Sequence, residues 1–410
     1  MRWLRRLPRI EGSTFVEEQL SSIASRLEQE MSDARLRILV VGAGIAGATL
    51  GALLRQRGER PAIIERGTGK EDGGYMLGLM PLGGRVLNGL GLAETYHQVS
   101  LPMRNYAMYN RNGRLIKNYP LAPLVERFGA VRGIERGKLL DMLRDVAGPI
   151  LYDTSIVRVV ETDDRALVTF NDGSSADFDL VVAADGAHSS LRELAFKKRE
   201  VEKFATGWGG YVLWSSTGNL PLDTYSELWS NGWGIGLYPV PGRIGIFLAG
   251  RHKVLASTDP ETYAREIERR LPPGPFAEAL KNRENVSGAY YWKMDDCRAR
   301  VWRRGRVMLL GDAADAFLPT AGIGASAAMD SAAALADELS RADADHIHYA
   351  LDLYEMRQRH RVETVQKNSR DLAGYMFVNS RFAVWMRDQL MRFYTLKRLI
   401  ADISSVMARA

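Results

Sequence analysis

A glycine-rich turn between two short apolar segments constrains the fold of this chain more than any other feature. Residues 37–41 have the pattern of a short buried strand, residues 44–56 that of a helix, and residues 61–64 that of a second strand. A strand, a helix and a second strand in this order predict a βαβ unit. The turn before the helix reads Gly-Ala-Gly-Ile-Ala-Gly over residues 42–47, which is the fingerprint of a dinucleotide-binding fold.

Each glycine of this turn has a physical task. Gly42 allows the tight turn, Gly44 lets the backbone approach a pyrophosphate, and Gly47 lets the helix lie close to the strand. The helix N-terminus presents free amide groups to phosphates. Glu65 ends the second strand, where its carboxylate can accept hydrogen bonds from both ribose hydroxyls and disfavours a 2′-phosphate. We therefore expect FAD or NAD, rather than NADP, to be held by Gly42, Gly44, Ile45, Ala46, Gly47, Glu65 and Arg66.

Two later carboxylates follow apolar runs of the kind that form buried strands. Residues 180–184 precede Asp185, and residues 307–310 precede Gly311-Asp312. Each acid should therefore lie at the carboxyl end of a strand, where open α/β sheets bind their ligands. Asp185 also has a purely structural interpretation, because aspartate often caps a turn such as the one that leads to Ser189.

Residues 180–192 and 307–314 resemble the Asp-Gly and Gly-Asp motifs of the group A flavoprotein monooxygenases, the para-hydroxybenzoate hydroxylase family. Arg136-Gly137-Lys138-Leu139 matches a further, looser motif of that family. The resemblance implies an α/β fold, in which a Rossmann-type FAD-binding domain is interleaved with a β-sheet substrate domain and followed by C-terminal helices. It also implies that Asp312 hydrogen-bonds the ribityl and pyrophosphate part of FAD, that Arg136 orients the cofactor, and that Asp185 supports FAD binding.

A second glycine-rich turn, residues 319–326, enters a helical run over residues 327–339. In the family that this chain resembles, amide donors at such a turn face the pyrimidine edge of the flavin, so Gly322, Gly324 and Ala325 are expected at the cofactor. The chain departs from the commonest family pattern at three positions. It has Asp315 where His is usual, Ile323 where Gln is usual and Ser326 where Asn is usual.

Residues 204–251 alternate in the manner of strands and carry several large aromatic side chains. This segment resembles the family's substrate-binding sheet, although aromatic residues on strands more often serve a core. We expect the substrate-binding residues to include Trp208, Tyr211, Trp214, Trp229 and Tyr238. No catalytic acid or base can be assigned, and His346, His348 and His360 do not form a convincing metal site.

The expected division of the chain follows from these segments. Residues 1–34 form an N-terminal extension, of which the first thirty are either part of the fold or dispensable. Residues 35–200 form the first part of the FAD-binding domain with substrate-domain insertions, 201–295 the substrate-binding sheet domain, 296–345 the second part of the FAD-binding domain, and 346–410 a helical region. Residues 381–409 combine basic and apolar side chains, so they either pack over the FAD domain or a homodimer partner, or contact a membrane surface.

The resemblance implies a monooxygenase that uses NADH or NADPH and O2 through a flavin C4a-hydroperoxide. The substrate would be a small aromatic, polyketide-like or isoprenoid molecule that is hydroxylated or epoxidised. A prenyl reductase on the same FAD scaffold is an alternative, as is a non-catalytic FAD- or NAD-binding regulator. A flavin-dependent halogenase is disfavoured, because the segment from Trp233 to Pro239 has only one of the two tryptophans of the halogenase pattern Trp-x-Trp-x-Ile-Pro.

Composition excludes several other classes of protein. The net charge of +6 is accompanied by no nucleic-acid-binding motif, so no nucleic-acid partner is expected. Cys297 stands alone, which excludes an internal disulfide or a multi-cysteine metal site and suits a cytoplasmic location. The sequence has no apolar run of the roughly 18 to 20 residues that a spanning helix needs.

Overall fold

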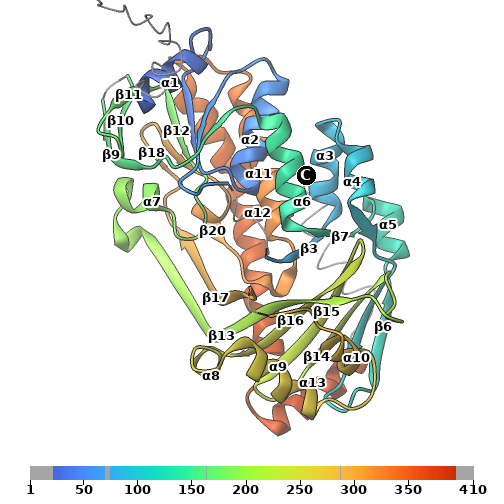
Figure 1. Ribbon diagram of the computed structural model, residues 1–410. Coiled ribbons are helices and arrows are strands. Elements are labelled where there is room, and N and C mark those ends of the chain that lie inside the picture. The colour runs from blue at the N-terminus through green and yellow to red at the C-terminus, as the bar shows by residue number, and fades with distance from the viewer. Residues whose placement is uncertain (1–21, 70–73, 163, 287, 394–410) are drawn as a thin grey trace, which may run out of the picture.

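The computed structural model describes residues 22–69, 74–162, 164–286 and 288–393 of the chain (Figure 1). The predicted βαβ unit is present as β1 (Ile38–Val41), α2 (Ile45–Gln56) and β2 (Ala62–Ile64). β1 lies between β2 and β12 (Leu180–Ala183) and runs parallel to both. All four residues of β1 are buried, as expected for a parallel strand that is covered on both faces.

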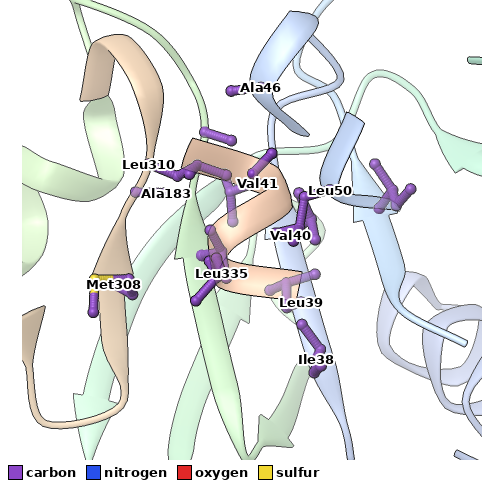
Figure 2. Packing of buried hydrophobic residues seen from close by; sticks show 14 of the residues in the cluster. Ile38, Leu39, Val40, Val41, Ala46, Leu50, Ala183, Met308, Leu310 and Leu335 are labelled. Carbon is purple, nitrogen blue, oxygen red and sulfur yellow. The ribbon is translucent and has the colours of Figure 1, made fainter. Parts of the chain in front are cut away.

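A six-stranded sheet in the order β18-β19-β12-β1-β2-β8 forms the centre of this unit. Its remaining strands are β8 (Ile150–Leu151), β18 (Arg303–Arg304) and β19 (Val307–Leu309). The helix α11 (Gly324–Leu339) packs against α2, which also contacts α6 (Arg136–Ala147). Val40, Leu50 and Leu335 lie together in the resulting core (Figure 2). The alanine-rich sequence of α11 favours this arrangement, because small side chains let the helices pack closely.

A second, eight-stranded sheet has the order β20-β17-β13-β16-β15-β14-β5-β6. Its strands are β5 (Asn105–Tyr109), β6 (Leu115–Pro120), β13 (Val201–Ser216), β14 (Thr224–Trp229), β15 (Trp233–Val240), β16 (Arg243–Arg251), β17 (Tyr290–Ala299) and β20 (Asp315–Ala316). Neighbouring strands are antiparallel except β14 and β5. The chain enters this sheet three times, with β5 and β6, with β13 to β17 and with β20, and it returns to the first sheet between these visits. The predicted α/β class with interleaved sheets is confirmed.

The two faces of the large sheet have different partners. One face packs Leu213, Leu228 and Ile246 against the helices α9 (Pro260–Arg270) and α10 (Pro275–Lys281), which follow the short helix α8 (His252–Leu255). The other face carries Val212 and Phe247 in a separate cluster. Because side chains alternate along a strand, residues adjacent in sequence serve these two clusters in turn.

Two small sheets and several short helices complete the molecule. One sheet has the order β3-β7-β4, with β3 (Met76–Leu79), β4 (Ser100–Pro102) and β7 (Arg132–Glu135). The other has the order β11-β10-β9, with β9 (Ile156–Glu161), β10 (Ala166–Phe170) and β11 (Ser175–Phe178). The helices are α3 (Pro81–Gly89), α4 (Ala93–Gln98), α5 (Ala122–Phe128), α7 (Ser190–Ala195) and the 3₁₀ turns η1 (Lys198–Glu200), η2 (Gly311–Ala313) and η3 (Pro319–Ala321).

The N-terminal segment is docked from residue 22 onwards. Helix α1 (Ile23–Glu30) buries Ala24 and Leu27 in the main core. Its first amide, that of Ile23, donates to Oδ2 of Asp172 at 2.8 Å. The packed body therefore includes α1, upstream of the predicted domain start at residue 35, and residues 1–21 lie outside the described part of the chain.

The predicted C-terminal helices are present as α12 (Ile347–Met376) and α13 (Arg381–Phe393), and residues 394–410 lie outside the described residues. α12 packs on α11 and ends at the large sheet, so it connects the two layers (Figure 1). α13 contacts β6 and exposes Phe382, Trp385, Leu390 and Phe393 on its outer side. In the described ranges no helix has both the length and the apolar character needed to cross a membrane. A homodimer and a membrane contact stay predictions.

Candidate cofactor and substrate site

A cavity of about 390 Å³ extends between the two sheets. Its lining joins residues that are far apart in the sequence: the turn after β1, the start of α6, the turn after β12, the turns before α11, and the inner face of the large sheet. The predicted cofactor residues on its wall are Gly42, Gly44, Ile45, Ala46, Glu65, Arg66, Arg136, Asp185, Asp312, Gly322, Gly324 and Ala325. The structure therefore brings twelve of the thirteen residues to one place, and it uses Gly47 for packing instead.

The glycine turn has the shape of a cradle. Gly42 has φ +104°, and a Cβ there would lie 2.5 Å from the carbonyl oxygen of Ala184. A Cβ on Gly47 would lie 1.9 Å from the carbonyl oxygen of Gly42, so the helix could not approach the turn with any larger residue. A Cβ on Gly44 would meet no atom within 4 Å. The open space at Gly44 and the free amides of α2 fit a dinucleotide pyrophosphate.

Glu65 lies beside this cradle with a fixed orientation. Its Oε2 accepts a hydrogen bond from the Ala43 amide at 2.9 Å, and its Oε1 accepts one from the Gly67 amide at 2.8 Å. An ionised carboxylate has about four acceptor positions, and these two bonds fill two of them. The remaining positions are available to the hydroxyls of a ribose. The geometry fits the predicted ribose contact.

Asp312, in η2, faces the cavity opposite Arg136 at the start of α6. Solvent reaches Asp312 through the cavity, while protein surrounds the carboxyl on its other sides. The loss of solvation raises the pKa of Asp312 to about 6, and the charge of Arg136 opposes this rise. The Arg136 guanidinium also lies 5.4 Å from the ring centroid of Tyr75, whose pKa burial raises to about 12.

Asp185 makes the contacts that its structural interpretation predicts. Its carboxylate is bonded to the hydroxyl of Ser189, and its Oδ2 accepts hydrogen bonds from the Ser190 hydroxyl at 3.3 Å and the Leu191 amide at 3.1 Å. These contacts hold the turn that enters α7. Asp185 also lines the cavity, so the cofactor role stays a prediction.

Of the three positions that depart from the family pattern, Ile323 lines the cavity, whereas Asp315 and Ser326 lie away from its wall. Ser326 accepts a hydrogen bond from the Met80 amide at 3.0 Å, which ties α11 to the end of β3. Asp315 is fully buried beside Arg298 on the neighbouring strand. Neither of its carboxylate oxygens makes a hydrogen bond of normal geometry within the described residues. Loss of solvation raises the pKa of Asp315 to about 7, although the charge of Arg298 opposes the rise.

Of the five aromatic residues expected at the substrate, the cavity is lined by Trp229 and Tyr238. Tyr211 points to the opposite face of the sheet, where its hydroxyl donates to the carbonyl oxygen of Leu255 at 2.9 Å. Trp208 lies behind the wall and stacks on Phe377 at 4.7 Å between ring centroids. Trp214 lies at the end of β13 under the guanidinium of Arg243, 3.7 Å from its ring centroid. Alternation along β13 turns Tyr211 away from the cavity, whereas Trp208 and Trp214 lie at positions along β13 that the cavity does not reach.

The structure adds lining residues that the sequence reasoning missed. They are Glu227 and the apolar or aromatic side chains of Tyr75, Val212, Phe247, Trp292, Met294, Leu318, Met376 and Phe377. Glu227 could have been noticed, because a carboxylate between Tyr225 and Trp229 would share their face of a strand. The other residues come from several strands, from the end of α12 and from connecting segments, and no local pattern marks them.

Glu227 is the centre of a hydrogen-bonded group. Its Oε2 accepts from the Tyr106 hydroxyl at 2.8 Å and from the Trp229 indole nitrogen at 2.9 Å. Its Oε1 accepts from the Tyr238 hydroxyl at 2.6 Å. Burial and the adjacent Glu227 carboxylate raise the pKa of Tyr238 well above its usual range, so Tyr238 stays protonated and donates.

Glycines in β15 make room for these rings. Glu227 pairs with Gly236, and a Cβ on Gly236 would lie 2.6 Å from the ring of Tyr238. A Cβ on Gly234 would lie 2.5 Å from the ring of Trp229. The rings of Tyr238 and Trp229 therefore occupy the space that side chains at positions 236 and 234 would fill.

Comparison with known proteins finds a matching family model and similar proteins. The family model described as "FAD binding domain" matches residues 35–369. The FAD-dependent urate hydroxylase of Klebsiella pneumoniae is 28% identical over 314 residues, which cover 73% of this chain and 80% of that protein. The 3-amino-4-hydroxybenzoate 2-monooxygenase of Streptomyces platensis is 30% identical over 355 residues, 83% of this chain and 88% of its own length. Klebsiella pneumoniae HpxO, solved with FAD and uric acid, superposes with a TM-score of 0.82 at 25% identity, covering 92% of this chain and 97% of that one.

Proposed function

Because the chain belongs to the group A FAD-dependent monooxygenases, we propose that it uses NADH or NADPH together with O2 to place one oxygen atom in a small organic substrate. When bound, FAD supplies hydride acceptance from the nicotinamide and the activation of O2. The observation that carries the proposal is the single cavity that runs from the glycine cradle to the aromatic face of the large sheet. Such a cavity brings a substrate and a dinucleotide into one shared space.

Different residues of this chain would hold different parts of the cofactor. The α2 N-terminus after Gly44 would hold the pyrophosphate, and Glu65 would accept hydrogen bonds from the adenosine ribose. Asp312 and Arg136 would hold the ribityl region, while the turn that enters α11 would offer its amides to the pyrimidine edge. The large sheet and the end of α12 exclude water from the reacting part of the substrate. A cytoplasmic location would supply the reduced nicotinamide.

The substrate class follows from the wall of the cavity and from the relatives. The wall is formed by flat and apolar side chains, and the two relatives are named for urate and for an aminohydroxybenzoate. A small aromatic or heteroaromatic molecule, or a polyketide-like or isoprenoid one, fits this wall, and hydroxylation or epoxidation would be the outcome. The alternative is a reductase on the same scaffold, which would consume NAD(P)H but no O2.

Labelled dioxygen tests the proposal. The FAD-loaded protein is incubated with NADH or NADPH, ¹⁸O2 and a panel of phenols, polyketide aromatics and isoprenoid quinone precursors. We expect one labelled oxygen atom in the organic product, with NAD(P)H and O2 consumed together. A product without label that forms equally well under argon would instead support the reductase.

A further inference from the structure

We propose that Glu227 binds the substrate directly, and that the substrate is an uncharged or cationic aromatic molecule with an O–H or N–H donor. The inference rests on the proposed function, and it names the substrate class of the same cavity. Glu227 lies on the cavity wall with 8% of its surface exposed, so almost all of its contacts are with protein.

The hydrogen bonds of Glu227 leave one acceptor position unfilled. A carboxylate has about four acceptor positions. The protein fills three of them, two on Oε2 and one on Oε1. The remaining position is on Oε1, which belongs to a side chain on the cavity wall. A buried carboxylate oxygen with a vacant position is stabilised by a donor, and a bound ligand can supply it.

The three protein donors also fix the direction of this oxygen. Tyr106 comes from β5, Trp229 from the same strand as Glu227, and Tyr238 from β15, so the carboxylate is held from both neighbouring strands. A fixed acceptor loses little entropy when a ligand binds. Preorganisation of this kind is typical of binding sites.

The charge of the wall selects against anions. Among the lining residues that the structure describes, the cations are Arg66 and Arg136, and both lie in the dinucleotide groove. Arg387, the cation behind Trp229, is directed to the Trp229 carbonyl oxygen and to Asp388. An anionic substrate would thus meet the Glu227 carboxylate without a compensating cation, whereas a neutral or cationic donor would satisfy it.

The remaining wall accommodates a flat ring. Trp229 and Tyr238 present their rings beside Glu227, and Phe247, Met294 and Met376 belong to the same apolar cluster. Aromatic and thioether side chains pack well against a planar aromatic ligand. A phenol or an aromatic N–H compound could therefore place its ring in this cluster and its donor on Oε1.

Three phenols of similar shape test the inference. The FAD-loaded protein is titrated with 4-hydroxybenzamide, 4-hydroxybenzylamine and 4-hydroxybenzoate, and binding is followed by the change in flavin absorbance. We expect the neutral and cationic probes to bind about tenfold or more tightly than the carboxylate, because all three share the phenolic donor and only the carboxylate brings a second negative charge near Glu227. In Glu227→Gln the preference should fall to within about threefold, and Glu227→Asp should restore part of it.

Glu284→Gln is the matched control. Glu284 carries the same carboxylate, but it pairs with Arg243 and does not line the cavity. It should keep the wild-type preference. The inference is overturned if 4-hydroxybenzoate binds as tightly as the other two probes or more tightly, or if Glu227→Gln keeps the wild-type preference. It is also overturned if neither 4-hydroxybenzamide nor 4-hydroxybenzylamine binds. For any probe that is turned over, Glu227→Gln should raise KM more than it lowers kcat. The proposed function fails separately, if probes bind with the expected preference but label from ¹⁸O2 never enters a product.

Discussion

The Ala43 amide donates a hydrogen bond to Oε2 of Glu65 at 2.9 Å, which joins the end of β2 to the glycine turn after β1. The two strands are neighbours in the sheet, so the carboxylate spans the gap between them. Glu65 therefore supports the shape of the cradle as well as offering an acceptor to a ribose. Removal of the Glu65 carboxylate should therefore weaken FAD binding through both effects.

Glu65→Ala is expected to weaken FAD binding by about 1 to 3 kcal/mol, which is about fivefold to more than a hundredfold in Kd. Fluorescence titration of the protein with FAD measures this change. Glu94→Ala, at an exposed position on α4, serves as the control and should leave Kd unchanged. Equal affinity of the Glu65 variant and the control would remove Glu65 from the site.

Arg136→Ala and Asp312→Ala should each lower the FAD content of the purified protein or the rate of flavin reduction, because both side chains face the cavity rather than the core. The fold should survive, so the circular dichroism spectrum should match that of the wild type. Flavin absorbance per protein and stopped-flow reduction by NADH or NADPH are the measurements. Full occupancy together with normal reduction in both variants would contradict the assignment.

Gly44 and Gly47 should respond differently to the same substitution. A Cβ on Gly47 would lie 1.9 Å from the carbonyl oxygen of Gly42, so Gly47→Ala should destabilise the fold by about 1 to 3 kcal/mol or more. A Cβ on Gly44 enters open space, so Gly44→Ala should keep the stability and lose FAD affinity. Thermal unfolding and FAD titration of both variants separate the two effects. A similar loss of stability in both would show that the groove at Gly44 is not open.

Asp315 should make the stability depend on pH. Burial raises the pKa of Asp315 in the folded protein to about 7, whereas an unfolded aspartate titrates near 3.9, at about its usual value. Between these values the unfolded chain releases a proton that the folded protein retains. This group therefore lowers the free energy of unfolding as the pH rises towards 7, and the loss is complete above that pH.

Asp315→Asn removes this effect while it keeps the shape of the side chain. It should raise Tm by more at pH 8 than at pH 5, with a gain of up to a few kcal/mol at the higher pH. Thermal unfolding at the two pH values measures the difference, and Asp345→Asn at an exposed position is the control. An equal change of Tm at both pH values would show that Asp315 is not the titrating group.

Much of the cofactor site could be predicted from the sequence, because its residues belong to local units. The turn from Gly42 to Gly47 and the strand that ends before Asp312 each carry their geometry within a few residues. The substrate end could not be predicted in the same way. Tyr211 and Val212 are neighbours in sequence, yet one packs under α9 and the other lines the cavity.

The βαβ unit, the glycine cradle and the acids at strand ends follow from the sequence alone, because backbone sterics and strand spacing act over short distances. Which side chains line the substrate end of the cavity depends on how the strands and helices pack together. Glu227 lies opposite Gly236 through the register of β14 and β15, and the Tyr238 ring occupies the space that this glycine leaves. Register and close packing join residues across strands, so the carboxylate, its donors and the cavity exist only once the sheet has formed.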